Sequence, residues 1–93
     1  MEIEFDPEKN AANRRKHKLD LADAAGFEFE TALVVEDDRY DYGETRWQAL
    51  GFINSRLHML VFTVRGTSVR AISLRKANDR ECVYYEKQTS APE

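Results

Sequence analysis

Arginine residues end two strand-like runs in the C-terminal half of this 93-residue chain. Arg65 ends the run 57–65, Arg75 ends the run 68–75, and a two-residue link joins the runs into a predicted hairpin. A guanidinium group can donate two parallel hydrogen bonds to a phosphate or a carboxylate. We therefore predict that Arg65 and Arg75 meet at the hairpin rim, where they could stabilise the extra charge of a phosphoryl transition state. The alternative is two solvated arginines at strand ends.

A histidine and a glutamate could move protons at such a site. His17 follows Lys16 at the end of the first predicted helix, and histidine titrates near neutrality. Glu81 lies in the last predicted helix, where Tyr84 shares its face and could stack on a nucleobase. Structural interpretations are also open. Lys16 and His17 would complement the dipole of the first helix. Glu81 would cap the last helix, and Tyr84 would pack against its neighbours.

Two further cations lie at strand ends, where they could contact a nucleic acid. Arg46 begins a strand two residues after Glu44, with which it could pair instead, and Lys76 directly follows Arg75. Charge is unevenly distributed along the chain. The first 50 residues hold 7 Lys and Arg against 13 Asp and Glu, whereas residues 51–93 hold 7 against 4. An anionic partner would therefore be attracted to the C-terminal half and a cationic one to the N-terminal half.

The sequence shows no recognisable metal or disulfide chemistry. Its two histidines, His17 and His58, lie far from each other and from the single cysteine, Cys82, so no zinc-type spacing is present. The acidic stretch 36–44 lacks the spacing of an EF-hand and is interpreted as a solvated loop. A lone cysteine cannot form an internal disulfide and indicates a reducing compartment. We expect no metal, no cofactor, no membrane span and a cytoplasmic protein.

Helix-start signals organise the N-terminal part of the chain. Asp6 before Pro7 predicts an N-cap and a first turn, and the helix should end near His17 and bury mainly Ala11 and Ala12. A second capping pattern predicts a short helix that begins at Asp20 and ends at Gly26.

The other predicted elements are strands and a last helix. Asn78 with Glu81 three residues later has the spacing of a capping box and predicts a helix over 78–88. Alternating or apolar runs predict strands over 2–5, 32–35, 46–53, 57–65 and 68–75.

Together these elements predict one α+β domain. It has N-terminal helices packed on an antiparallel sheet of about four strands, followed by a C-terminal helix. The domain should span residues 1–88, with a frayed tail at 89–93. Alternation places the odd and even residues of 46–53 on opposite faces of the sheet, and Gly51 marks a bulge or a close approach.

Motifs spread along the chain form a recognisable set. In order, they are Phe5-Asp6-Pro7-Glu8-Lys9, Asn13, Lys16-His17, Ala24 with Phe27, Gly43-Glu44-x-Arg46 with Gly51, Val61 to Arg65, and Ile72-Ser73-x-Arg75-Lys76-Ala77 with Glu81 and Tyr84. The set resembles the BrnT family of type II toxins and covers the chain from Glu2 to about Tyr85. The chain departs from the family pattern at Leu19-Asp20-Leu21, where many members have a glycine after the histidine and a phenylalanine soon after.

The resemblance implies a RelE-like ribonuclease fold, with helices on one face of an antiparallel sheet, and RNA cleavage that stops translation. It also implies a cognate antitoxin that neutralises the toxin in a complex, expected to be a heterotetramer with an antitoxin dimer, and that binds operator DNA. RNA cleavage would proceed without metal, by attack of a ribose 2′-hydroxyl on the adjacent phosphate. The other interpretation is a catalytically inactive module that only binds a partner protein.

The resemblance and the residues point to the same arginines, since the family's important pair would fall on Arg65 and Arg75. The predicted catalytic residues are Arg65, Arg75, His17 and Glu81, and the predicted RNA contacts are Lys16, Arg46, Lys76 and Tyr84.

Overall fold

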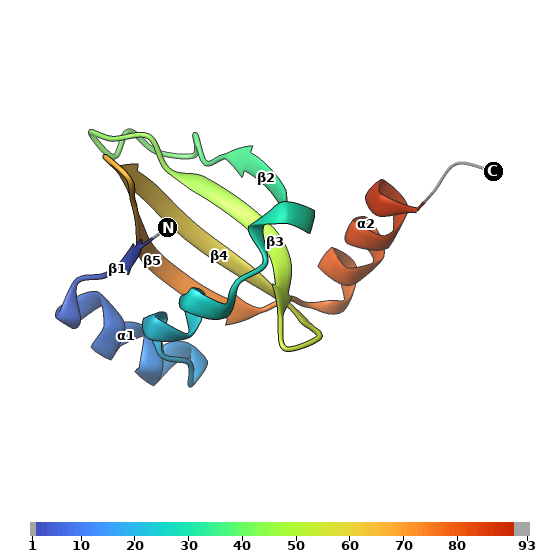
Figure 1. Cartoon of the computed structure of the whole chain (residues 1–93), viewed down its shortest axis with the longest axis horizontal. Coiled ribbons are helices and arrows are strands. Elements are labelled where there is room, and N and C mark those ends of the chain that lie inside the picture. The colour runs from blue at the N-terminus through green and yellow to red at the C-terminus, as the bar shows by residue number, and fades with distance from the viewer. Residues whose placement is uncertain (1, 91–93) are drawn as a thin grey trace.

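A five-stranded sheet runs through the middle of the molecule, in the order β1-β5-β4-β3-β2 (Figure 1). The structure is a computed structural model, and it describes residues 2–90. The elements are, in chain order, β1 (Glu2–Glu4), α1 (Pro7–His17), the 3-10 helices η1 (Leu21–Gly26) and η2 (Phe29–Thr31), β2 (Leu33–Glu36), β3 (Trp47–Ile53), β4 (Arg56–Arg65), β5 (Ser68–Lys76) and α2 (Asp79–Thr89).

The α+β class is confirmed, but the prediction of an antiparallel sheet of about four strands was wrong. Strands β3, β4 and β5 form the expected antiparallel meander, and β2 joins it at one edge. At the other edge β1 pairs in parallel with β5, with Ile3 opposite Val69. Local patterns could not reveal this pairing, because a three-residue strand finds its partner more than sixty residues away in the chain.

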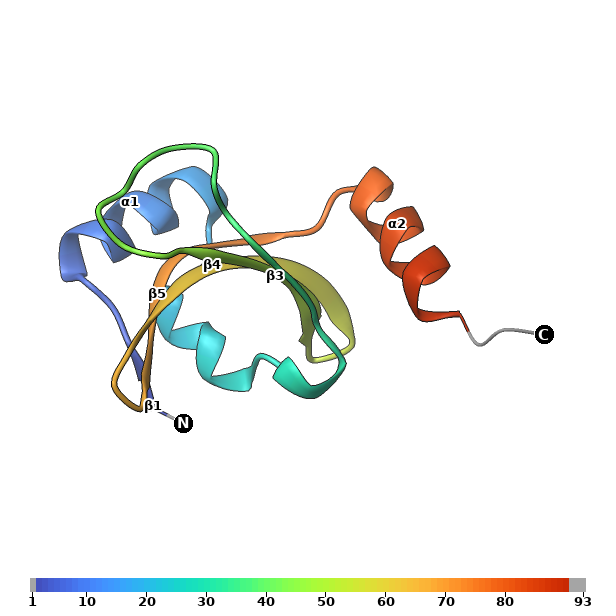
Figure 2. The same ribbon diagram turned by 90° about the horizontal axis from the view of Figure 1, so that it is seen from above.

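The two faces of the sheet are covered by different elements. Figure 2 shows η1 and η2 on one side of the sheet, and α1, the loop 37–46 and α2 on the other. The expectation of helices on one face was therefore wrong. The larger hydrophobic core lies under the 3-10 helices, where Leu21 and Phe27 pack with Leu60 and Leu74. The smaller core lies under α2 and contains Leu50, Leu57, Ala77 and Tyr85.

Strand β3 contributes to both cores, as the alternation predicted. Ala49 and Trp47 pack in the larger core, whereas Leu50 and Phe52 pack in the smaller one. Gly51 marks a close approach, because a Cβ atom at this position would lie 2.5 Å from the ring of Phe27. Glycine is thus required where the 3-10 segment crosses the sheet.

Helix α1 begins as predicted, with the Asp6 side chain accepting a hydrogen bond from the backbone N–H of Glu8. The prediction that it buries Ala11 and Ala12 was wrong, since both are exposed. The buried residue is Asn13, whose side chain pairs with the backbone of β5. A polar side chain anchors this helix because the edge of β5 beyond β1 offers free backbone groups.

The turn after α1 forms although the chain departs from the family pattern there. Lys18 takes the left-handed conformation, with φ of 63°, and its N–H donates to the carbonyl oxygen of Arg14. Asp20 then caps the following element through the N–H of Ala22. That element is a 3-10 helix, and it ends at Gly26 as expected.

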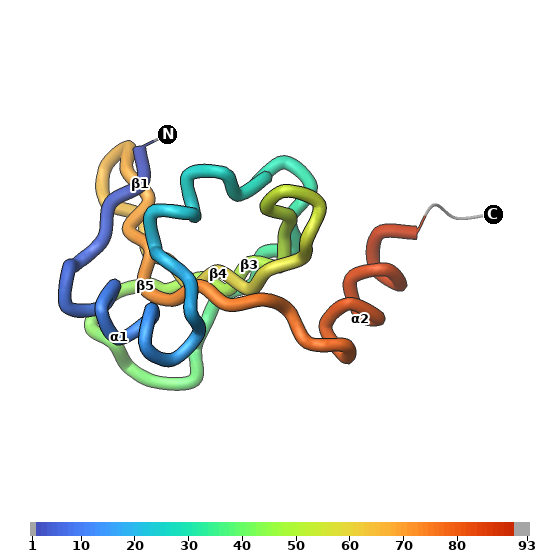
Figure 3. Tube along the Cα trace, turned by 90° about the horizontal axis from the view of Figure 1, so that it is seen from below, coloured from blue at the N-terminus to red at the C-terminus, as the bar shows by residue number. Residues whose placement is uncertain are grey.

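Helix α2 opens with the predicted capping box, in which Asn78 and Glu81 each accept the other's backbone N–H. It projects from the body of the molecule, as Figure 1 and Figure 3 show. Its one buried residue is Tyr85, whose hydroxyl donates to the carbonyl oxygen of Thr31 at 2.7 Å. The helix continues to Thr89, so only the last part of the expected tail, residues 91–93, lies outside the described residues.

Candidate active site

A cleft with a volume of about 510 Å³ lies on the face of the sheet opposite the 3-10 helices. Strands β3, β4 and β5 form its floor, the end of α1 and the loop 37–46 form its sides, and the first turn of α2 closes one end. Its lining residues are Lys16, His17, Arg39, Gln48, Met59, Val61, Ser73, Arg75 and Glu81. Three of these side chains carry positive charge and one is a histidine, so the cleft suits an anionic ligand.

Arg75 is held rigidly at the α2 end of the cleft. Its two terminal nitrogens each donate to one carboxylate oxygen of Glu81, both at 2.8 Å. The same carboxylate accepts from the N–H of Asn78 at 3.0 Å, so the capping box of α2 orients the ion pair. Hydrogen bonding to Glu81 raises the pKa of Arg75 above its usual value, and the bonds from Arg75 lower the pKa of Glu81. Glu81 therefore positions a guanidinium group and is a poor base.

His17 and Lys16 reach the same cleft from the last turn of α1. Burial of the imidazole is the main cause of a lowered pKa for His17, and the nearby charges of Lys16 and Arg75 add to it. A histidine with a lowered pKa is neutral at physiological pH and can accept a proton.

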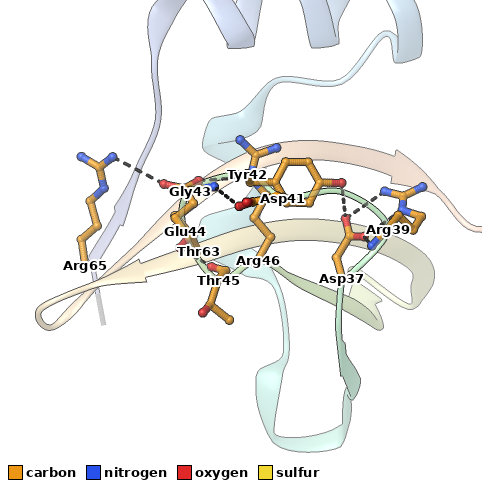
Figure 4. A network of polar contacts seen from close by, with 10 residues as sticks. All are labelled: Asp37, Arg39, Asp41, Tyr42, Gly43, Glu44, Thr45, Arg46, Thr63 and Arg65. Atoms are coloured by element: carbon orange, nitrogen blue, oxygen red, sulfur yellow. Dashed lines mark hydrogen bonds and ion pairs between the residues drawn. The ribbon is translucent and has the colours of Figure 1, made fainter.

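Arg39 also lines the cleft, and sequence reasoning missed it. The interpretation of 36–44 as a solvated acidic loop holds for most of its residues, which are exposed, but not for Asp37, whose side chain is only 1% exposed. Two nitrogens of Arg39 donate to Asp37 at 2.8 and 2.9 Å, and the Tyr42 hydroxyl donates to it at 3.2 Å (Figure 4). These bonds hold the pKa of Asp37 far below its usual value and raise that of Arg39. The Asp-x-Arg spacing was the available signal.

Arg65 does not share a pocket with Arg75, so the predicted convergence of the two arginines was wrong. Arg65 lies opposite Ser68 in the β4–β5 register, whereas Arg75 lies opposite Met59. Seven positions of β5 separate the two sites, or about 23 Å along the strand. The reason is the antiparallel hairpin itself, which places the end of its first strand beside the start of its second. Arg65 instead lies 3.8 Å from Glu44, beside a separate hollow at the hairpin tip.

The remaining predicted RNA contacts also lie outside the cleft. Arg46 donates to Glu44 at 3.1 Å, the alternative pairing, and its guanidinium lies 4.0 Å from the centre of the Tyr42 ring. Lys76 follows Arg75 on β5, so the alternation of the strand points it to the opposite face, where it lines a different hollow. Tyr84 lines an apolar groove between α2 and strands β2 and β3, which we call the α2 groove. The α2 groove is lined by Leu33, Val35, Gln48, Leu50, Met59, Arg80, Glu81 and Tyr84.

Within residues 2–90, no three histidine, cysteine, aspartate or glutamate side chains are grouped so that they could hold a metal ion. No helix in this part of the chain is both long and apolar enough to cross a membrane.

The fold and the cleft define a small α+β protein with a site for an anion, made of arginine, lysine and histidine. Residues 5–81 match the family described as "Ribonuclease toxin, BrnT, of type II toxin-antitoxin system", and the chain belongs to this family. It is similar to the Brucella abortus ribonuclease toxin, BrnT, known from a crystal structure at 1.1 Å resolution. The two share 31% sequence identity with a TM-score of 0.66, over 85% of this chain and 99% of that one. No curated protein matches the chain.

Membership of this family makes the chain a ribonuclease toxin of a type II toxin–antitoxin system, and it implies an antitoxin as partner. The resemblance drawn from the sequence motifs is thereby confirmed.

Proposed function

We propose that the chain cleaves RNA in the cleft without a metal ion and thereby inhibits translation in the cytoplasm. The observation that supports this is the bidentate ion pair of Arg75 and Glu81 beside His17 and Lys16. Arg75, Lys16 and His17 together supply positive charge for a phosphodiester and groups for its proton transfers.

In this proposal, His17 accepts the proton of a ribose 2′-hydroxyl as its oxygen attacks the adjacent phosphorus. The bond from phosphorus to the 5′-oxygen of the next nucleotide breaks, and that oxygen takes a proton from Lys16. The products are a 2′,3′-cyclic phosphate and a 5′-hydroxyl. Arg75 stabilises the extra negative charge on the phosphoryl oxygens, and Glu81 holds the Arg75 guanidinium in place.

The outlying cations have a different proposed role. Arg65 and Arg46 lie on the Glu44 side of the loop 37–46 and would contact phosphates that flank the cleavage site. Lys76 would do so from the opposite face of the sheet. Such contacts contribute affinity that falls with salt, and they do not act on the scissile bond.

The proposed partners follow the family pattern. The antitoxin would bind as a dimer with two toxin chains in a heterotetramer, and the complex would contact operator DNA through the antitoxin alone. A RelE-like relationship of the fold belongs to the same proposal.

RNA cleavage by the purified chain should be unchanged by EDTA. The positive charge that a metal ion would supply already comes from Arg75, Lys16 and Arg39 in the cleft. The measurement is the cleavage rate of a single-stranded RNA with and without EDTA, with the DNA oligonucleotide of the same sequence as the uncut control. Loss of cleavage in EDTA that a divalent cation restores would contradict the metal-free scheme. A chain that cleaves no RNA and does not arrest growth on induction would be an interaction module.

The cleavage rate at RNA concentrations well below saturation, which reports the free protein, should fall as the pH is lowered, with an inflection below the usual histidine value of 6.5. His17 must be neutral to accept a proton, and its lowered pKa keeps it neutral above that inflection. Replacing Lys16→Gln removes the proposed proton donor, so cleavage should slow. It also removes a like charge that lowers the pKa of His17, so the inflection of the remaining activity should move to higher pH. The matched control is Lys18→Gln, whose side chain donates to the carbonyl oxygen of Arg15 and lines no part of the cleft. An inflection that stays in place in Lys16→Gln would remove His17 from the role of base.

A further inference from the structure

The α2 groove is lined largely by apolar side chains, two of which are about half exposed. It has a volume of about 380 Å³ and is walled by Leu33 and Val35 of β2, Leu50 of β3 and Tyr84 of α2. Val35 is 55% exposed and Tyr84 is 50% exposed. Clustered apolar side chains that remain in contact with water mark a surface on which another molecule binds.

The packing of α2 explains why the groove stays open. The helix projects away from the sheet (Figure 2), and it packs on the smaller core through Cys82 and Tyr85. The bonds from Arg75 to Glu81 and from the Tyr85 hydroxyl to Thr31 hold it in this position. Side chains of α2, β2 and β3 wall the space between these two attachments and β2, but they do not fill it.

The α2 groove is continuous with the cleft. Gln48, Met59 and Glu81 line both hollows. An occupant of the groove that continues past these side chains enters the mouth of the cleft, so it competes with RNA for the same space.

Charge distinguishes a protein occupant from RNA. Glu36 ends β2, the outer wall of the groove, and Asp38 follows two residues later; both are exposed, and Arg80 lines the groove from α2. The acidic end of the outer wall repels a phosphate backbone and attracts lysine and arginine. Strand β2 is also the edge of the sheet, so an extended segment can pair with its backbone.

We propose that the antitoxin inserts an apolar segment, flanked by lysine or arginine, into the α2 groove and thereby closes the cleft to RNA. This inference rests on the proposed function of the cleft.

The test compares two neighbouring valines of β2. Val35 lines the groove, whereas Val34 is 44% exposed and lies on the other face of the strand. The cognate antitoxin, produced from the reading frame adjacent to the toxin gene, is titrated against wild type, Val35→Asp and Val34→Asp. We expect Val35→Asp to weaken binding by about 30-fold or more and Val34→Asp by less than about 3-fold. At an antitoxin concentration that silences wild type and Val34→Asp, the Val35→Asp protein should continue to cleave RNA.

Cleavage of free RNA at the wild-type rate by both variants shows that each is folded, and Val35→Lys repeats the test with the opposite charge. Equal antitoxin affinities of folded Val35→Asp and Val34→Asp would overturn the docking proposal and leave the nuclease proposal intact. Wild type that binds antitoxin at the groove but cleaves no RNA would overturn the proposed function instead. If the toxin alone dimerises, and Val35→Asp abolishes the dimer without changing antitoxin affinity, the occupant is a second copy and the proposal fails.

Discussion

Replacing Arg75→Ala should lower the rate of RNA cleavage by about 10²–10³-fold, the usual effect of losing one preorganised contact to a transition-state charge. Arg75 is suited to this effect because Glu81 fixes its guanidinium with two bonds of 2.8 Å before any ligand arrives. Its raised pKa keeps it charged at every pH of interest. The measurement is the single-turnover rate on a defined RNA, with thermal unfolding of the same sample as the check on folding.

Two arginines of the same hairpin serve as matched controls for Arg75. Arg70 lies on the same strand but pairs with Glu4 at 3.8 Å, and Arg65 pairs with Glu44 at the far end of the hairpin. Their alanine variants should retain the single-turnover rate at saturating RNA. An Arg65→Ala loss as large as that of Arg75→Ala would show that RNA bridges both ends of the sheet. Undiminished cleavage by Arg75→Ala would remove this residue from the mechanism.

Replacing Asn13→Ala should destabilise the fold by about 3 kcal/mol or more, because it leaves several buried backbone groups without partners. The Asn13 amide nitrogen donates to the carbonyl oxygens of Leu19 and Leu74, and its oxygen accepts from the N–H of Leu74, all at 2.9 Å. The side chain is buried and joins α1 to the open edge of β5. For a domain of this size the melting temperature should fall by about 12–24 °C. Calorimetry or thermal unfolding followed by circular dichroism measures the change.

The control for Asn13 is its neighbour Arg14, which is exposed and lies 4.0 Å from Asp20. Arg14→Ala should change the free energy of unfolding by less than about 0.5 kcal/mol, as is usual for exposed ion pairs. A comparably small effect of Asn13→Ala would mean that water replaces the amide and that α1 is held by other contacts. His17 lies about one turn after Asn13, so the same amide also sets its position relative to Arg75.

Proline, capping residues and alternation were sufficient to predict most elements from the sequence. Asp6 before Pro7 and the Asn78–Glu81 pair act over three or four residues, and both ends formed as predicted. The alternation of β3 likewise assigned its residues to the correct faces. These features are local, because each depends on hydrogen bonds or side-chain directions within one element.

Only some of the residues that line the cleft could be predicted from the sequence. Lys16, His17, Arg75 and Glu81 were singled out by residue type, and the structure brings all four together. Arg39 was missed because its importance depends on the burial of Asp37, which follows from how the loop 37–46 folds over the sheet.

What the sequence determined by itself was the residue types, the helix caps, the strand faces and the family motifs. Only the tertiary structure decided which arginine belongs to the cleft, that β1 pairs in parallel with β5, and that Asn13 anchors α1. The physical reason is range. Caps and alternation arise from neighbours in the chain, whereas strand direction and register depend on partners that folding brings together across the sheet.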